Sequence, residues 1–187
     1  MKVVLINGRK GSGKDTVANY LFEKLGEGVV VIPNAKAVKE EAYQFYNWNG
    51  EKDLLGRQLL VDITNTGYRF DPYFWEKKTI EYIYALKEQG TRIDMLIIPD
   101  WRYECTYDFF TNLDHPKVEV TTLRVERRVT VEEMCDPRES FDVYRSESQL
   151  DGFPVDYTID NNGTIEDLHN LIDIMLADGE IINDTES

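Results

Sequence analysis

Five short apolar runs alternate along the chain with segments in which apolar residues recur at helical spacing. The runs are KVVLIN (2–7), GVVVIP (28–33), IDMLIIPD (93–100), KVEVTTLRV (117–125) and VDYTID (155–160). The helical segments are 14–26, 34–48, 57–70, 71–90, 103–113 and 164–176, the third becoming less regular toward its end. Continuous apolar strands that alternate with helices predict an α/β fold, with a five-stranded parallel sheet covered by helices on both faces.

Several predicted helix ends carry residues that favour starting or stopping a helix. Gly26 and Gly90 are expected to end the first and fourth helices, and Asn34 to cap the start of the second. Asp71 is expected to cap the fourth helix, with Pro72 in its first turn.

One long polar stretch, 126–152, is dense in charge and only weakly periodic. It is too long for an ordinary connection and predicts a lid or binding insertion. The shorter stretch 49–56 predicts a loop, and 177–187 a frayed tail. Because no linker or internal repeat divides the chain, we expect one domain over residues 1–187.

Charge and composition narrow the classes of partner. The formal net charge is −14, which disfavours a broad nucleic-acid surface because phosphate binding needs clustered Lys and Arg. Two cysteines and two histidines fit neither a disulfide framework nor a zinc site. The N-terminus has no signal-peptide pattern, and no stretch approaches the roughly 20 apolar residues of a membrane span. We expect a cytoplasmic protein with no nucleic-acid or membrane partner.

The loop GRKGSGKDT, residues 8–16, contains the spacing G-x-x-x-x-G-K and joins a predicted buried strand to a predicted helix. In that context the pattern predicts a phosphate-binding loop for ATP. Its backbone would wrap the phosphates, and Lys14 would reach between the β- and γ-phosphates. The alternative is a glycine-rich turn with a solvated lysine. The predicted ATP-binding residues of the loop are Gly8, Gly11, Ser12, Gly13, Lys14, Asp15 and Thr16.

Asp15 stands where such loops carry Ser or Thr beside the lysine. A carboxylate is also a hard oxygen ligand, and the hydroxyl of Thr16 follows it. The pair therefore predicts a Mg²⁺ site, held directly or through a metal-bound water. The alternative is that Asp15 only favours the start of the helix through its charge.

Four blocks of the sequence, in order, resemble the deoxynucleoside monophosphate kinases of tailed bacteriophages. They are GRKGSGKDT, RQLL with YRFDPYFWEKK (57–60 and 68–78), LIIPDWRYE (96–104), and SESQLDGFPVDYTIDNNGTIEDLHNLI (146–172). The loop and the S/A-E-x-x-L-D ending are also similar to animal-type phosphomevalonate kinases. Both families are P-loop kinases, so the resemblance implies a three-layer sandwich with a five-stranded parallel sheet, an acceptor region at about 34–90 and a lid insertion at about 126–152.

The resemblance also implies roles for residues beyond the loop. Asp100, at the end of a buried strand, would orient a metal-bound water or bind the acceptor, and Arg102 would bind the acceptor phosphate. Trp101 departs from the Thr or Val that is more familiar there. Arg57 and Arg69 would bind the acceptor, and Trp75 could stack on a base, although aromatic residues at helical spacing are more often core.

Basic residues cluster before and within the predicted lid. Arg127 and Arg128 are expected to stabilise the transferring phosphate, and Arg124 to bind ATP, although any one arginine could instead lie on a solvated face. Arg145 and Glu147 are candidates for acceptor binding. Asn161 and Asn162 follow the last predicted strand and are expected beside the adenine, unless they form only a turn.

Together these features predict ATP- and Mg²⁺-dependent phosphoryl transfer to a deoxynucleoside 5′-monophosphate, giving the diphosphate. The rival acceptor is phosphomevalonate or another small phosphate, and a non-catalytic P-loop regulator is the alternative from a different class. The partners would be small nucleotides. A homodimer is compatible with the resemblance, and a phage-encoded protein would act in the host cytoplasm.

Overall fold

A computed structural model of the protein describes residues 1–114, 117–128, 140–179 and 181. Five parallel strands form one sheet in the order β2-β3-β1-β4-β5. They are β1 (Lys2–Asn7), β2 (Val29–Val31), β3 (Met95–Ile98), β4 (Glu119–Glu126) and β5 (Tyr157–Asp160). Each predicted apolar run contains one of these strands, so the predicted parallel sheet is confirmed.

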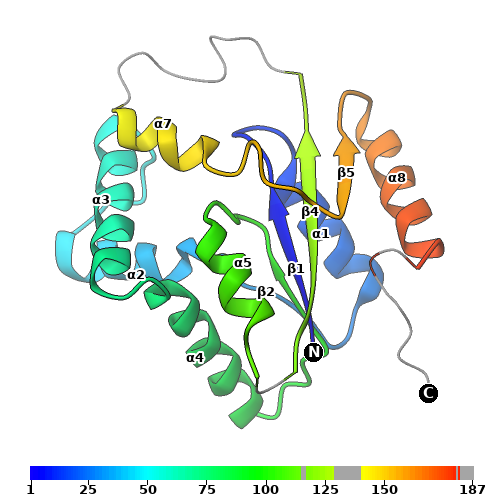
Figure 1. Ribbon diagram of the computed structural model, residues 1–187, viewed down its shortest axis with the longest axis horizontal. Coiled ribbons are helices and arrows are strands. Elements are labelled where there is room, and N and C mark those ends of the chain that lie inside the picture. Colours follow the sequence, from blue (N-terminus) through cyan, green and yellow to red (C-terminus); the bar gives the residue numbers. More distant parts are fainter. Residues whose placement is uncertain (115–116, 129–139, 180, 182–187) are drawn as a thin grey trace.

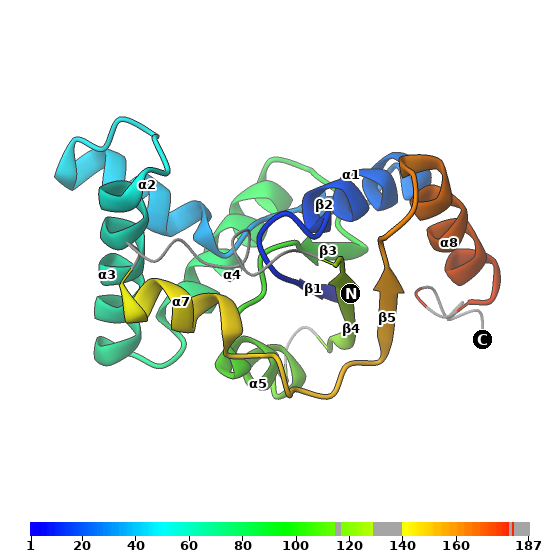
Figure 2. The ribbon, with the colours of Figure 1, turned by 90° about the horizontal axis from the view of Figure 1, so that it is seen from above.

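Helices pack on both faces of the sheet (Figures 1 and 2). The helices of the described residues are α1 (Lys14–Leu25), α2 (Ala35–Tyr46), α3 (Leu54–Phe70), α4 (Phe74–Glu88), α5 (Glu104–Thr111), α7 (Phe141–Ser148) and α8 (Ile165–Ala177), of which α1, α4, α5 and α8 contribute to the two core clusters at the sheet. In the described part of the chain, no helix has both the length and the apolar character needed to cross a bilayer.

The alternation of side chains along β1 divides the core into two layers. Val4 and Ile6 pack in one cluster with residues of α1 and α8. Val3 and Leu5 pack in a second cluster with Ile83 of α4, among others. Because successive strand residues point to opposite faces, one apolar strand supports both layers and gives the three-layer arrangement.

A third cluster lies among α2, α3 and α4, away from the strands, and forms one side of the molecule (Figure 1). Trp75 is 2% exposed there, and its indole nitrogen donates to the carbonyl oxygen of Thr64 at 2.9 Å. Gly67 of α3 lies against the Trp75 ring, where a Cβ would come within 2.6 Å of ring atoms. This close approach fixes the crossing of α3 over α4.

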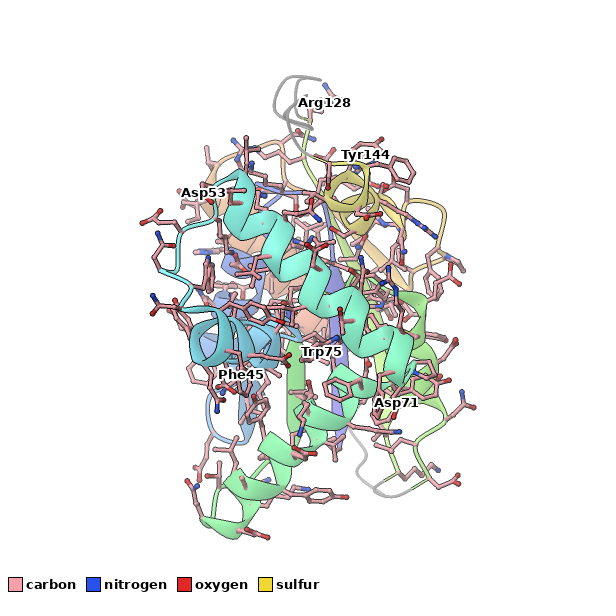
Figure 3. The ribbon with its side chains drawn as sticks, turned by 90° about the vertical axis from the view of Figure 1, so that its left-hand side faces the viewer. Phe45, Asp53, Asp71, Trp75, Arg128 and Tyr144 are labelled. Carbon is pink, nitrogen blue, oxygen red and sulfur yellow. The ribbon has the colours of Figure 1, made fainter. Side chains whose placement is uncertain are left out.

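Two predicted helix starts are wrong in detail. Asp71 and Pro72 precede α4, which begins at Phe74, and Asp71 instead ends α3 while accepting from the backbone of Tyr73. Helix α3 begins three residues earlier than predicted and continues unbroken to Phe70. Its N-cap is Asp53, whose side chain accepts from the backbone N–H of Gly56 at 2.7 Å. Figure 3 shows Asp53 and Asp71 at opposite ends of α3.

The stretch predicted as a lid lies between β4 and β5. Residues 129–139, its central part, and residues 180 and 182–187 of the predicted tail lie outside the described residues. The described part contains α7, which the weak periodicity did not predict, capped by the side chain of Ser140. Helix α7 packs beside α3 (Figure 2).

Candidate active site

The loop between β1 and α1 is shaped to receive an anion. Gly11 and Gly13 have φ values of 76° and 102°, in the left-handed region that favours glycine. The hydroxyl of Ser12 is buried and has no hydrogen-bond partner. Buried polar groups are normally hydrogen-bonded, so this orphaned hydroxyl inside a glycine loop at a helix N-terminus fits a phosphate oxygen.

Lys14 is the first residue of α1 and lies at the centre of this loop. Its ammonium donates to the carbonyl oxygen of Arg9 at 3.0 Å. Burial lowers its pKa, while the nearby carboxylate of Glu147 acts in the opposite direction. A desolvated ammonium held by one carbonyl gains strongly from a phosphate, because charge–charge attraction is larger away from water.

A deep cleft extends from the loop toward α3. Its basic lining residues are Lys10, Lys14, Lys39, Lys52, Arg57 and Arg102. Its apolar and aromatic lining residues include Val38, Leu60, Val61, Tyr68, Trp75 and Tyr103. A cleft lined by both cationic and apolar side chains suits a small molecule that carries both a phosphate and an apolar or flat group.

Two carboxylates, Asp15 and Asp100, line the same cleft as Lys14. The backbone N–H groups of Asn34 and Ala35 donate to the two oxygens of Asp100 at 2.7 and 3.0 Å. Asp100 thus caps the start of α2, the role that the sequence had suggested for the Asn34 side chain. Asn34 occupies the N-cap position but its side chain makes no capping bond, so that prediction is wrong.

Arg102 is held at the mouth of the cleft by α7. Its guanidinium forms a salt bridge with Glu147 at 2.7 Å and donates to the hydroxyl of Ser146 at 3.3 Å. Both partners line the cleft with it. Helix α7 therefore contributes an acidic partner to a cationic group that faces the acceptor end.

A second hollow opens on the other side of the loop, toward α8. Its lining includes Gly11, Gly13, Lys14, Asp15, Thr16, Arg127, Asn161 and Gly163. The amide of Asn161 donates to the carbonyl oxygen of Ser12 at 2.7 Å, so the turn after β5 braces the glycine loop. Gly11, Lys14 and Asp15 line both hollows, which makes the loop their meeting point.

Comparison with known proteins assigns the architecture. No protein-family model matches the sequence, and no curated protein matches it. Among solved structures, a sugar kinase from Janibacter sp. is similar with a TM-score of 0.50 and 15% identity, over 97% of this chain and 96% of that chain. The fold of this chain, a five-stranded parallel sheet with helices on both faces, is similar to the fold of that kinase.

Two further solved structures share less of the geometry. A deoxyadenosine kinase from M. mycoides has a TM-score of 0.48 at 15% identity, over 95% of this chain and 100% of that chain. A shikimate kinase from Aquifex aeolicus has a TM-score of 0.44 at 16% identity, over 98% of this chain and 100% of that chain. At these identities the likeness concerns the fold alone.

Within this fold, the predicted acceptor arginines line different hollows. Arg57 lines the cleft with Lys14, and its Nε donates to the carbonyl oxygen of Lys52 at 2.9 Å. Arg69 and Arg145 line a different hollow between α3, α5 and α7, together with Glu104 and Asp142. The structure therefore places Arg57, and not Arg69, in the cleft that contains Lys14.

The predicted lid arginines Arg124, Arg127 and Arg128 line one hollow together with Gly8 of the loop, and each has further contacts. The guanidinium of Arg124 donates to the carbonyl oxygens of Leu150 and Phe153 at 2.6 and 2.8 Å, so it fastens the segment after α7 to the sheet. Arg127 lines the hollow toward α8. The backbone N–H of Arg128 donates to the side chain of Asn162 at 2.8 Å, and Figure 3 shows Arg128 at the edge of the molecule.

The cleft and loop contain residues that sequence reasoning missed. Arg9 forms an ion pair with Asp151, lies over the ring of Tyr144, and has one buried guanidinium nitrogen without a partner. Burial, with Lys39 nearby, lowers the pKa of Lys52. The doublet Arg9-Lys10 inside the loop was a visible signal, whereas Lys39 and Lys52 carry no motif.

Proposed function

We propose that the protein is an ATP- and Mg²⁺-dependent kinase that phosphorylates a deoxynucleoside 5′-monophosphate to the diphosphate. The observation that carries the proposal is the sharing of Gly11, Lys14 and Asp15 by two hollows, one on each side of the glycine loop. One hollow would take ATP, and the other would present an acceptor phosphate to it. Such an arrangement suits in-line transfer, in which positioning and charge neutralisation supply the catalysis.

In the proposed reaction, an oxygen of the acceptor phosphate attacks the γ-phosphorus of ATP. The new P–O bond forms as the bond from the γ-phosphorus to the β–γ bridging oxygen breaks, and ADP leaves with that electron pair. The attacking phosphate is already ionised near neutral pH, so no side chain has to remove a proton. Lys14 and Arg102 would neutralise the charge that spreads over the transferring group.

The donor set near Lys14 fits a magnesium ion. Asp15 and Thr16 offer a carboxylate and a hydroxyl, and Asp100 offers a second carboxylate across the cleft. Bound there with ATP, Mg²⁺ would supply charge neutralisation at the phosphates. Arg127 and Asn161 would contact the nucleotide on the α8 side, and Arg57 and Arg102 the acceptor phosphate.

Two aromatic residues of the cleft support a base-bearing acceptor. Tyr68 and Tyr103 lie edge to face with ring centroids 4.9 Å apart and both line the cleft, whereas Trp75 is 2% exposed and belongs to the core. Aromatic walls bind flat bases well because stacking adds to the burial of apolar area. Arg69, Arg145, Arg128 and Asn162 stay predictions as substrate contacts, as do a homodimer and a cytoplasmic location.

A coupled assay of ADP formation tests the proposal directly. The wild-type protein is supplied with ATP, Mg²⁺ and, in turn, dTMP, dGMP, dCMP, dAMP or phosphomevalonate. Turnover with at least one deoxynucleotide is expected, and Lys14→Met should lower kcat by about 100-fold or more through loss of transition-state charge stabilisation. Lys78→Met is the matched control, because Lys78 lies on the exposed surface of α4 and pairs with Glu81.

Two outcomes would overturn the deoxynucleotide assignment. Turnover with phosphomevalonate alone would identify the rival acceptor. Binding of ATP without acceptor-stimulated ADP formation for any of the five compounds would favour a nucleotide-responsive regulator. Equal activity of Lys14→Met and wild type would contradict the placement of the active site at the loop.

A further inference from the structure

Glu76 of α4 is a completely buried acid that the proposed reaction does not use. Its side chain is 0% exposed, and among the described residues no lysine or arginine forms an ion pair with it. One carboxylate oxygen, Oε2, is buried without any hydrogen-bond partner. A buried acid without a cation is costly, and an apolar residue of similar size would avoid the cost. Its presence therefore calls for a role.

The other oxygen of Glu76 collects donors from three separate segments. Thr106 of α5 donates at 2.6 Å, Tyr68 of α3 at 2.9 Å, and the side-chain amide of Asn34 at 3.5 Å. The same amide also donates to the hydroxyl of Thr106 at 3.2 Å. Asn34 and Tyr68 both line the cleft beside Lys14. Glu76 thus ties together elements that enclose the acceptor end.

The side chain of Asn34 is held from both of its polar ends. Its amide nitrogen faces Glu76 and Thr106, and its carbonyl oxygen lies 3.3 Å from the hydroxyl of Thr79, which shares its one proton between Asn34 and the carbonyl oxygen of Trp75 at 3.2 Å. Asn34 is itself 9% exposed. Its side chain is therefore fixed, and the backbone that carries it is fixed with it.

That backbone is what holds Asp100. The N–H groups of Asn34 and Ala35 are at the start of α2, where a helix leaves its first N–H groups without partners inside the helix. Both donate to the carboxylate of Asp100, one to each oxygen. A carboxylate gripped at both oxygens keeps one orientation, and small misplacements of a catalytic group cost large factors in rate.

We infer that Glu76 is a positioning residue for the kinase reaction: through the buried bonds of Asn34 it fixes the two N–H groups that orient Asp100 in the cleft. Glu76 touches neither substrate nor the reacting atoms. The inference rests on the proposed function for its consequence in catalysis. The mechanical link from Glu76 to Asp100 rests on the hydrogen bonds alone.

Amide hydrogen exchange at Asn34 and Ala35 tests that link without any turnover. Because Asp100 is the acceptor for both N–H groups, their exchange rates report on the grip directly. In Glu76→Gln both amides should exchange about tenfold faster, the loss expected when a bond of about 1.4 kcal/mol is weakened. Asp100→Ala gives the exchange rate of the two amides when their acceptor is removed completely. Ile83→Val, a change in another buried residue of the same helix, is the matched control and should leave both rates unchanged.

Kinetics then test the consequence. Glu76→Gln should lower kcat about tenfold while the KM for ATP stays within about twofold, because the network lies on the acceptor side. In an Asp100→Ala background, Glu76→Gln should cause no additional loss, since both changes act on one group. Thr106→Val, which removes the shortest donor at nearly constant volume, should act in the same direction if Glu76→Gln folds poorly.

The outcomes distinguish the positioning role of Glu76 from the proposed kinase function. Wild-type exchange of both amides in Glu76→Gln and Thr106→Val, or additive losses with Asp100→Ala, would overturn the positioning role. If the wild-type protein phosphorylates no acceptor, the proposed function fails, while the exchange rates still decide whether Glu76 positions Asp100.

Discussion

Substitutions at Gly13 can separate the cost of a left-handed backbone from the cost of a clash with the side chain of Asn161. Its φ of 102° is unfavourable for any residue with a Cβ. A Cβ at Gly13 would also overlap the side-chain amide of Asn161, which donates to the carbonyl oxygen of Ser12 at 2.7 Å. Gly13→Ala should therefore strain the loop and push away the group that braces it.

The magnitude follows from the two contributions. A left-handed conformation costs an alanine about 1–2 kcal/mol. Loss of the Asn161 hydrogen bond costs about 0.5–1.5 kcal/mol more. Gly11 provides the matched control, because its φ of 76° is also left-handed but a Cβ there meets nothing within 4 Å. Gly11→Ala should therefore cost only the backbone part, about 1–2 kcal/mol.

Urea unfolding without nucleotide measures these differences directly. Gly13→Ala should lower the free energy of unfolding by more than Gly11→Ala. In an Asn161→Ala background the two substitutions should cost the same, since the overlapping amide is gone. Equal destabilisation by Gly13→Ala and Gly11→Ala in the wild-type background would refute the contact with Asn161. In a second assay, the Kd for ATP should rise in both variants, because both residues line the proposed nucleotide hollow.

Three further predictions concern stability, each measured by urea unfolding. Gly67→Ala should cost about 1–3 kcal/mol by overpacking against the Trp75 ring, with a lowered midpoint, whereas an unchanged midpoint would contradict the close crossing of α3 and α4. Burial raises the pKa of Glu76 above its ordinary 4.5, so the native state keeps its proton longer than the unfolded chain. The free energy of unfolding should therefore fall as pH rises from about 4.5 to the raised pKa, by up to about 1.4 kcal/mol per pH unit more in the wild type than in Glu76→Gln. The same pH dependence of unfolding in the two proteins would refute this. Thr164→Ala should lower the free energy of unfolding by about 1 kcal/mol, because the side chains of Thr164 and Asp167 form a capping box at the start of α8. An unchanged free energy of unfolding in both Thr164→Ala and Asp167→Ala would contradict a stabilising role for this capping box.

The strands could be predicted from the sequence because apolar burial on both faces leaves a continuous signature. All four residues of β3 are buried, and five of the six residues of β1. The order of the strands could not be predicted in the same way. An apolar run indicates that a strand is buried on both faces, but it does not indicate which strand pairs with it.

The start of α3 was missed because local composition and tertiary contact gave opposite signals. Gly56 lies inside the helix, although glycine normally weakens a helix interior. Here a side chain would not fit: a Cβ at Gly56 would collide with the backbone of Glu51 and approach the indole nitrogen of Trp48 to 2.9 Å. The glycine is required by packing, and packing is not visible in a window of sequence.

The residues of the candidate site that were predicted correctly as neighbours are those that are close in the sequence. Gly11, Gly13, Lys14, Asp15 and Thr16 line one hollow because a single loop carries them. Residues from different elements depended on resemblance alone. Asp100 lines the cleft, but the network that holds it draws on Asn34 and Glu76, to which the sequence analysis gave no role in the site.

The position of Arg69 outside the cleft that contains Lys14 has a geometric cause that the sequence did contain. Arg57, Leu60, Val61, Thr64 and Tyr68 line the cleft, and their spacing of three and four residues marks one face of α3. Arg69 directly follows Tyr68, so it is turned about 100° away from that face at 3.6 residues per turn. It consequently lines the hollow on the other side, with Arg145. Because Arg57 lines the cleft with Lys14 and Arg69 does not, an acceptor assay should show a larger rise in KM for Arg57→Ala than for Arg69→Ala, and the reverse order would favour Arg69 as the acceptor contact.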